Sequence, residues 1–204
     1  MITDSSNRQK HNQKQGLLIL AIVLLPMITS YFMFKTGWGM PTNTINKGTL
    51  LMPPKSVSML NLADSSDSLK RLYPAETKKW RIMVPISANC EAACQKNLFI
   101  TRQVHIRLAE KAPRVERIFL ALDGVSAQQK QQLLVEHPNV LWLDSSQAAL
   151  VNWLTNTAMA TVQVDKRYFL IDQDGFGMMS YSAEHTGQEL LEDLKKLLKY
   201  TYEK

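Results

Sequence analysis

The stretch KWRIMVPISANCEAACQKNLFI, from Lys79 to Ile100, contains both cysteines of this 204-residue chain and decides its fold. The apolar run from Trp80 to Ile86 predicts a buried strand, and a short polar turn follows it. Cys90 and Cys94 come next, where a helical pattern starts. The stretch therefore predicts a strand, a turn and a helix, with paired thiols where the helix begins.

The spacing of the two cysteines restricts their geometry. Unpaired N–H groups and the helix dipole favour a thiolate at a helix N-terminus. In a CxxxC motif, two helical residues would place their Cβ atoms about 5 to 6 Å apart, whereas a relaxed disulfide needs about 3.8 Å. We therefore expect Cys90 to lie in the turn before the helix, free to bond to Cys94 or to share a soft metal ion with it. The alternative is a pair of buried cysteines that only pack.

The N-terminal segment predicts a membrane anchor. Residues 1–15 are polar and form a tail, and the 19 residues from Gly16 to Phe34 carry no charge. Such a run can span a hydrocarbon core of about 30 Å as a helix. A cleaved signal peptide is the alternative, although the run is long and no clear cleavage site follows it. Charge bias hardly decides the orientation, but a dithiol suits an oxidising compartment and favours a short cytoplasmic tail and a periplasmic C-terminal domain.

Residues 35–56 predict an extended connection, because glycines and prolines occur there without periodicity. Residues 57–204 are then one domain, which begins with an edge strand at 57–62, a polar turn and a hairpin up to Pro74. The 36–204 part carries 20 basic and 17 acidic residues and shows no basic stripe with interleaved aromatics. Nucleic acid is therefore not a predicted partner.

Alternating strands and helices follow the cysteines. Further strands are predicted at 115–122, 139–143, 167–172 and 176–181. Helices are predicted at 91–111, 126–136, from 144 or 145 to 156, and from a capping box at Thr186 and Glu189 onward. With right-handed crossovers, this order builds an α/β fold. We expect a thioredoxin-like arrangement with a central mixed sheet, helices on both faces and a terminal antiparallel hairpin, preceded by one transmembrane helix.

The chain resembles the Sco/SenC family, membrane-anchored thioredoxin-fold proteins of cytochrome c oxidase assembly. The resemblance rests on the single anchor, the KW strand that leads into CxxxC, the order of elements and the segment VDKRYFLIDQDG at 164–175. The lead-in NKGTLLMPP at 46–54 is similar to short Sco-like proteins of bacteria. The resemblance implies a single-pass protein of the bacterial inner membrane with a periplasmic domain. Its implied partners are the copper-binding subunit of cytochrome c oxidase or other assembly factors.

The resemblance also implies a copper site made of both CxxxC cysteines and a histidine that follows a Val-Asp pair. Cys90 and Cys94 match these cysteines, but Lys166 stands at the position of the histidine. Its ammonium group has no acceptor and cannot ligate a metal unless it is deprotonated. His185, in the loop before the last helix, is a weak replacement candidate. Two thiolates without an imidazole favour Cu(I) over Cu(II), so any copper is expected as weakly or transiently held Cu(I).

Other residues of metal-binding or catalytic type have simpler interpretations. We expect His105 to be a boundary or satisfied core histidine and His137 to be a solvent-exposed turn residue before Pro138. Glu192 and Asp193 are predicted to lie on the solvated face of the last helix. The segment DQDG at 172–175 predicts a turn, since it lacks the later acid of a calcium loop. The sequence contains no glycine-rich phosphate loop, HExxH or GxSxG motif.

Three functions from different classes remain open. The first is an assembly factor for cytochrome c oxidase that handles Cu(I) or maintains thiols through the CxxxC pair. The second is a membrane-tethered thiol-disulfide oxidoreductase with other clients, in which Cys90 is the attacking thiolate and Cys94 resolves the mixed disulfide. The third is a redox-inert docking module with the same fold.

Overall fold

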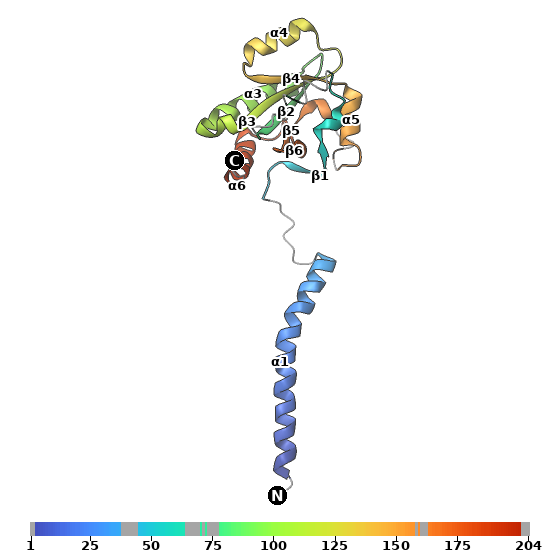
Figure 1. The fold of residues 1–204 in the computed structure, drawn as a ribbon, viewed down its shortest axis with the longest axis vertical. Coiled ribbons are helices and arrows are strands. Elements are labelled where there is room, and N and C mark those ends of the chain that lie inside the picture. The colour runs from blue at the N-terminus through green and yellow to red at the C-terminus, as the bar shows by residue number, and fades with distance from the viewer. Residues whose placement is uncertain are drawn as a thin grey trace. The chain divides into compact units, whose positions relative to one another are not determined.

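The computed structural model describes residues 3–37, 45–63, 70, 72, 78–157, 159 and 163–200. The chain divides into two compact units, Met1–Ile45 and Asn46–Lys204 (Figure 1). The first unit contains helix α1, Thr3–Thr36, which continues through Pro26. Its part from Lys14 to Thr36 is long and apolar enough to cross a membrane, a property that a membrane anchor and a signal sequence share.

The second unit is built on a mixed sheet, which has six strands in the described part of the chain, in the order β1-β6-β5-β2-β3-β4 (Figure 1). Strands β2, β3 and β4 are parallel, whereas β5 is antiparallel to β2, and β6 is antiparallel to β5 and to β1. The strand bounds are Thr49–Ser56, Trp80–Ile86, Val115–Ala121, Val140–Asp144, Arg167–Ile171 and Phe176–Ser182. The predicted mixed sheet with a terminal antiparallel hairpin is thus confirmed.

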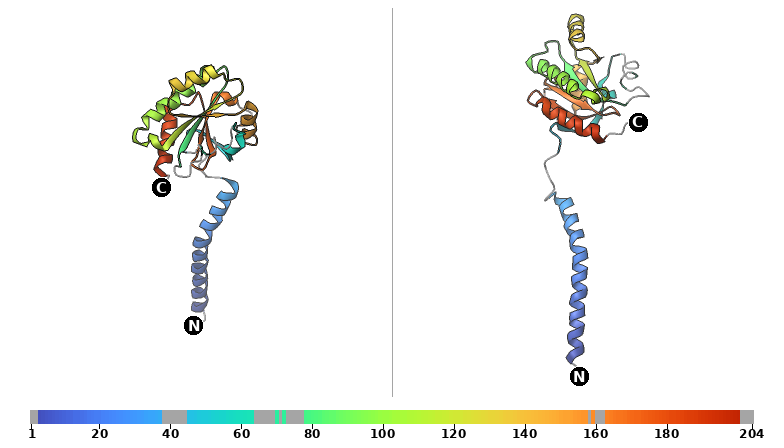
Figure 2. Two further views of the ribbon diagram at one scale, coloured as in Figure 1. Left: turned by 45° about the horizontal axis from the view of Figure 1, so that its top comes forward. Right: turned by 90° about the vertical axis from the view of Figure 1, so that its left-hand side faces the viewer.

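Helices cover both faces of this sheet, as predicted. Their bounds are α3 Ala92–Arg107, α4 Ala127–Glu136, α5 Gln147–Leu154 and α6 Gly187–Tyr200, with short 3-10 turns η1 Val57–Leu60, η2 Ala109–Arg114 and η3 Val164–Lys166. On one face, α3 and α6 lie side by side, and α4 adds Leu133 to their core cluster (Figure 2). On the other face, α5 contacts η1 over a second cluster. Successive side chains of a strand point to opposite faces, so alternate residues of each central strand belong to the two clusters.

The first strand begins earlier than the sequence predicted. Residues 57–62 were expected to form an edge strand, but 57–60 form the 3-10 turn η1, which Ser56 caps by accepting a hydrogen bond from the Ser58 backbone N. Strand β1 instead lies at 49–56, in the segment predicted to be an extended connection. Its two prolines fall at a pairing irregularity on the sheet edge, where a missing donor is tolerated. The expected turn and hairpin up to Pro74 lie almost entirely outside the described residues.

Helix ends also differ from the predicted ones. The cysteine helix was predicted to reach Lys111, but α3 ends at Arg107 and η2 follows it. Helix α5 was expected to begin at Asp144 or Ser145, yet Ser146 is its N-cap and accepts from the Ala149 backbone N at 3.0 Å. The Ser145 hydroxyl is instead directed to the Leu60 carbonyl of η1. Tertiary contacts thus select the cap among neighbouring candidates.

The capping box of the last helix is confirmed. Glu189 N donates to Thr186 Oγ1 at 3.3 Å, and Thr186 N donates to Glu189 Oε2 at 2.7 Å. The bond from the Thr186 backbone N, and then the bond of 2.9 Å that the Thr186 hydroxyl donates to Glu189 Oε2, lower the pKa of the Glu189 carboxyl. Four leucines of this helix are buried in the core, namely Leu190, Leu191, Leu194 and Leu198.

Candidate functional site

The two cysteines lie where strand β2 gives way to helix α3. Strand β2 ends at Ile86, and the Cys90 backbone N donates to the Ser87 carbonyl at 3.1 Å, which closes a turn. Glu91 is the N-cap, so Cys90 precedes the helix and Cys94 lies in its first turn. A disulfide joins the two residues, whose Cα atoms are 5.1 Å apart. The turn therefore brings Cys90 close to Cys94, the placement expected from the CxxxC spacing.

The two sulfur-bearing residues differ in exposure. Cys94 is only 3% exposed and belongs to the core cluster under α3 and α6. Cys90 is half-buried and contributes to the wall of an open groove. A reactant that approaches the disulfide from solvent therefore meets Cys90 first.

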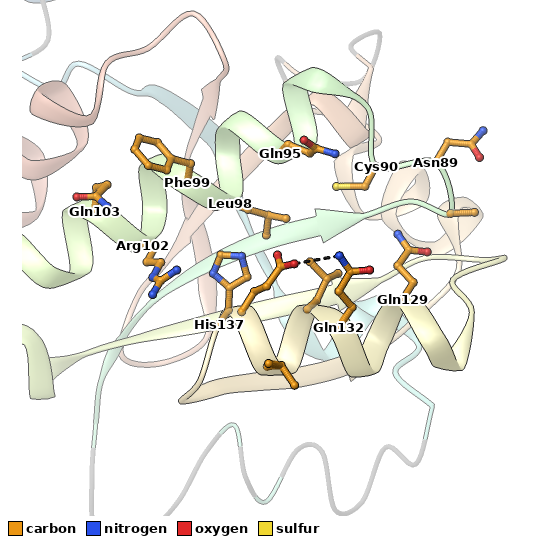
Figure 3. Close-up of a pocket in the computed structure, with 14 residues that line it drawn as sticks. Asn89, Cys90, Gln95, Leu98, Phe99, Arg102, Gln103, Gln129, Gln132 and His137 are labelled. Atoms are coloured by element: carbon orange, nitrogen blue, oxygen red, sulfur yellow. Dashed lines mark hydrogen bonds between the residues drawn. The ribbon is translucent and has the colours of Figure 1, made fainter.

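This groove runs between α3 and α4 and has a volume of about 860 Å³. It is lined by the loop at 88–90, by one face of α3 from Gln95 to Gln103, and by α4 residues up to His137. Figure 3 shows Cys90 and Asn89 at one end and Arg102 with His137 at the other. The groove beside the disulfide is thus large enough to hold a molecule bigger than a single thiol compound.

The prediction that His137 is exposed is wrong. Its side chain is 6% exposed and meets the Phe119 ring edge to face, with centroids 5.3 Å apart. Burial, followed by the charges of Arg117 and Arg102, lowers the pKa of His137, so the imidazole is neutral at pH 7. Its Nδ1 has no hydrogen-bond partner among the described residues. The strand that carries Phe119 was predicted, but the local pattern before Pro138 did not show that His137 would pack against it.

Arg117 is a buried cation that the sequence reasoning missed. It lies on β3, is 5% exposed, and its Nε and Nη1 atoms have no partner within the described part of the chain. Burial, and then repulsion by Arg102, lowers the pKa of Arg117 to about 10. Its guanidinium carbon lies 5.8 Å from the centroid of the Phe119 ring. The period-2 pattern of β3 could have found it, since Arg117 lies between Val115 and Phe119 on the same inward face of the strand.

The remaining histidine candidates lie away from the disulfide groove. His105 Nε2 is 2.9 Å from the Val115 carbonyl, which confirms a satisfied boundary histidine. His185 Nδ1 accepts from the Ser182 backbone N at 3.0 Å and its ring meets Tyr181 edge to face. Lys166 is exposed on η3, a turn that packs against α3.

The donor set does not fit a resident three-coordinate copper ion. Among the described residues, no group of three His, Cys, Asp or Glu side chains gathers in one place. Cys90 and Cys94 are joined to each other, and the position of the Sco/SenC histidine holds the ammonium group of Lys166. We therefore assign no metal centre to this structure.

Asp193 is buried, which corrects the prediction of a solvated acid. The residue is 1% exposed, and its Oδ2 accepts from Lys47 N at 2.8 Å, from Gly48 N at 3.0 Å and from the Tyr181 hydroxyl at 3.0 Å. Its neighbour Glu192 is half-buried and accepts from Gln188. Helix α6 is thereby fastened to the start of the sheet domain.

The DQDG segment forms the predicted turn rather than a calcium loop. Asp172 Oδ1 accepts from the Asp174 backbone N at 3.0 Å and from the Phe176 backbone N at 2.7 Å. The side-chain oxygen is therefore used to close the hairpin between β5 and β6.

Comparison with known proteins supports the fold. Residues 80–201 match the model of a family described as transmembrane-like, thioredoxin-like, C-terminal domain. Yeast Sco1 with copper bound is similar to the chain with a TM-score of 0.51 and 14% identity, covering 79% of this chain and 97% of that one. Arabidopsis thaliana ScoI with copper bound gives 0.45 and 18%, covering 61% and 88%. No curated protein matches by sequence. At 14% identity, the similarity to the yeast structure concerns the fold alone, which the family match describes as thioredoxin-like.

Proposed function

The chain belongs to the transmembrane-like, thioredoxin-like C-terminal domain family, and from this premise we propose that it is a membrane-anchored thiol-disulfide exchange protein. The observation that carries the proposal is the unequal exposure of the two bonded cysteines. Cys94 is buried in the core, whereas Cys90 lines the groove between α3 and α4. Exchange needs one sulfur that a client can reach and one that is protected.

The exchange is written as two thiol attacks. A client thiolate attacks Cys90 Sγ, a client–Cys90 disulfide forms, and the Cys90–Cys94 bond breaks with Cys94 leaving as a thiolate. A second client thiolate then attacks the client sulfur of the mixed disulfide and releases Cys90 as a thiolate. Two electrons pass from the client dithiol to the protein, and the client leaves as a disulfide. The reverse sequence reduces a client disulfide.

Helix α3 supports the thiolate forms. Cys94 lies in its first turn, and Cys90 just precedes the N-cap. The unpaired N–H groups and the positive end of the helix dipole favour negative charge there. Glu91, an exposed acid between the two cysteines, opposes this effect. The expected net effect is a moderate stabilisation of the thiolate forms.

The proposed client is the copper-binding subunit of cytochrome c oxidase, or another assembly factor of that enzyme. The Sco/SenC resemblance of the sequence and the Sco-like fold support this choice. The proposed location is the bacterial inner membrane, with α1 as an uncleaved anchor and the domain at 46–204 in the periplasm. There the reduced dithiol form of the protein would, by the reverse sequence, reduce a disulfide between the client's copper-binding cysteines and would itself become the Cys90–Cys94 disulfide.

Cu(I) is a second candidate, as cargo rather than as a resident cofactor. Cys90 and Cys94 are close enough to be bonded, so in the reduced protein both thiolates are available to one soft ion. Lys166 supplies no third ligand. An anaerobic Cu(I) competition titration of the reduced protein, with the Cys90→Ser, Cys94→Ser double variant as control, tests this role.

The experiment that tests exchange compares two single variants of the full-length chain in lipid nanodiscs. Cys94→Ser leaves the accessible thiol, and Cys90→Ser leaves the buried one. With the disulfide reagent 5,5′-dithiobis(2-nitrobenzoate), we expect Cys94→Ser to react at least about tenfold faster, because Cys90 lines the groove. Equal rates would contradict the proposal. Full oxidase assembly in cells with the double variant would favour the redox-inert docking module instead.

A further inference from the structure

The groove beside the disulfide has one end that is lined by Arg102, His137 and Glu136, with the buried cation Arg117 nearby. Arg102 lines it from α3, and His137 lines it from α4 (Figure 3). Arg117 does not line the groove but lies near His137, because both contact the Phe119 ring: the Arg117 guanidinium carbon is 5.8 Å from the ring centroid, and the His137 ring centroid is 5.3 Å from it. Glu136 is the acid at this end, and it accepts a hydrogen bond from Gln132 at 2.9 Å.

Two buried side chains at this end lack partners in the described structure. Arg117 has unpaired Nε and Nη1 atoms, and His137 has an unpaired Nδ1 atom. Both residues are more than nine-tenths buried. A buried cation without a counter-charge is costly, so a carboxylate bound in the groove near Arg102 and His137 would partly offset the charge of Arg117 without contacting it. Arg102 and the buried Arg117 together outweigh Glu136 at this end, which therefore favours an anion.

The rest of the groove suits an extended peptide. Its walls carry five carboxamide side chains, namely Asn89, Gln95, Gln103, Gln129 and Gln132. A carboxamide can both donate to and accept from a peptide backbone. Phe99 on α3 and Val135 on α4 also line the groove and are exposed apolar side chains. Such a mixture is typical of a surface that contacts a polypeptide.

We propose that the groove binds an extended segment of the client polypeptide, with the client cysteine at Cys90 and a client carboxylate at the Arg102 end. This inference rests on the proposed function and names its substrate class. The Cys90 sulfur is bonded to that of Cys94, and Arg102 lies eight residues beyond Cys94 on α3, a rise of about 12 Å. An extended chain rises about 3.3 Å per residue. The acidic residue of the client is therefore three or four positions from the reactive cysteine.

The test uses the full-length Cys94→Ser variant in nanodiscs and blocked synthetic peptides. Each peptide carries one cysteine as its mixed disulfide with thionitrobenzoate, and an aspartate four positions before or after it. The Cys90 thiolate attacks the peptide sulfur, forms a Cys90–peptide disulfide and releases the coloured thionitrobenzoate anion. Matched peptides carry asparagine in place of aspartate.

We expect one of the two aspartate peptides to react about tenfold faster than its asparagine match at low ionic strength. Arg102→Gln should remove most of this preference. Lys96→Gln, which removes an exposed charge from the same helix outside the groove, should retain it. Equal rates for aspartate and asparagine peptides, or equal effects of both substitutions, would overturn the inference. If no peptide reacts faster with the Cys94→Ser variant than with free cysteine, the proposed function itself is overturned.

Discussion

The Tyr181 hydroxyl donates a hydrogen bond to Asp193 Oδ2 at 3.0 Å in the interior of the domain. The same oxygen accepts two backbone N–H groups, from Lys47 and Gly48. Burial, and then the negative charge of Asp193, raises the pKa of Tyr181, so the phenol stays protonated as a donor. One carboxylate thus joins helix α6, strand β6 and the residues that precede β1.

We expect Asp193→Leu to lower the free energy of unfolding by about 3 kcal/mol, because it leaves buried donors without an acceptor. Chemical denaturation of the full-length protein in detergent measures this change. Glu192→Gln is the matched control at the neighbouring, half-buried acid and should change the stability by less than about 0.5 kcal/mol. Equal losses in the two variants would contradict the assigned role of Asp193.

Stability should fall on acidification because of His137. Its pKa is lowered in the folded protein by burial, Arg117 and Arg102, with an opposing contribution from Glu136. The stabilisation is complete above the unfolded pKa of about 6.5 and decreases as pH falls below it toward the folded pKa. We therefore expect the free energy of unfolding of His137→Gln to change less between pH 7.5 and 5 than that of the unsubstituted protein. An unchanged slope in unfolding measurements over that range would show that His137 does not contribute.

Arg117→Met should stabilise the domain while weakening the proposed peptide preference. The substitution removes a buried cation with two unpaired donor atoms, which raises the stability. It also removes the contact of the guanidinium with the Phe119 ring, which lowers the stability. The expected net gain is about 1 kcal/mol. Thermal unfolding measures the gain, and the aspartate and asparagine peptides measure the preference. A clear loss of stability would mean that Arg117 has a counter-charge in the folded chain.

Lys166→His should give the reduced protein a measurable affinity for Cu(II). Lys166 is exposed on η3, which packs against the cysteine helix, and imidazole suits Cu(II) where an ammonium group does not. Anaerobic Cu(II) titration followed by electron paramagnetic resonance measures binding, with Lys195→His on α6 as the control for a surface histidine. Similar signals from both variants would exclude a specific third ligand at position 166.

Local patterns predicted the elements whose determinants lie close together in the chain. The KW strand, the capping box at Thr186 and Glu189, and the Asp172 turn need only neighbours within a few residues. The position of Cys90 before the helix followed from covalent geometry alone. These features allowed the fold and the place of the disulfide to be anticipated.

Features with distant partners could not be read from the sequence. Strand β1 exists because Thr49 pairs with Ser180, and its two prolines made the segment resemble a linker. Asp193 and His137 look like surface residues until Lys47 and Phe119 are brought against them by the fold. The charged end of the groove depends on residues from α3, from the end of α4 and from β3, so no local sequence motif predicts it.

The Asp193 linkage has a mechanical consequence. The segment that arrives from α1 enters the domain at Lys47 and Gly48, and a Cβ atom at Gly48 would lie 2.5 Å from the Tyr181 ring. A pull on residues 45–48 is therefore resisted by hydrogen bonds to α6 before it can separate the edge strand β1 from β6. Force applied at the N-terminal end of the domain would thus be passed to the C-terminal helix α6 through Asp193.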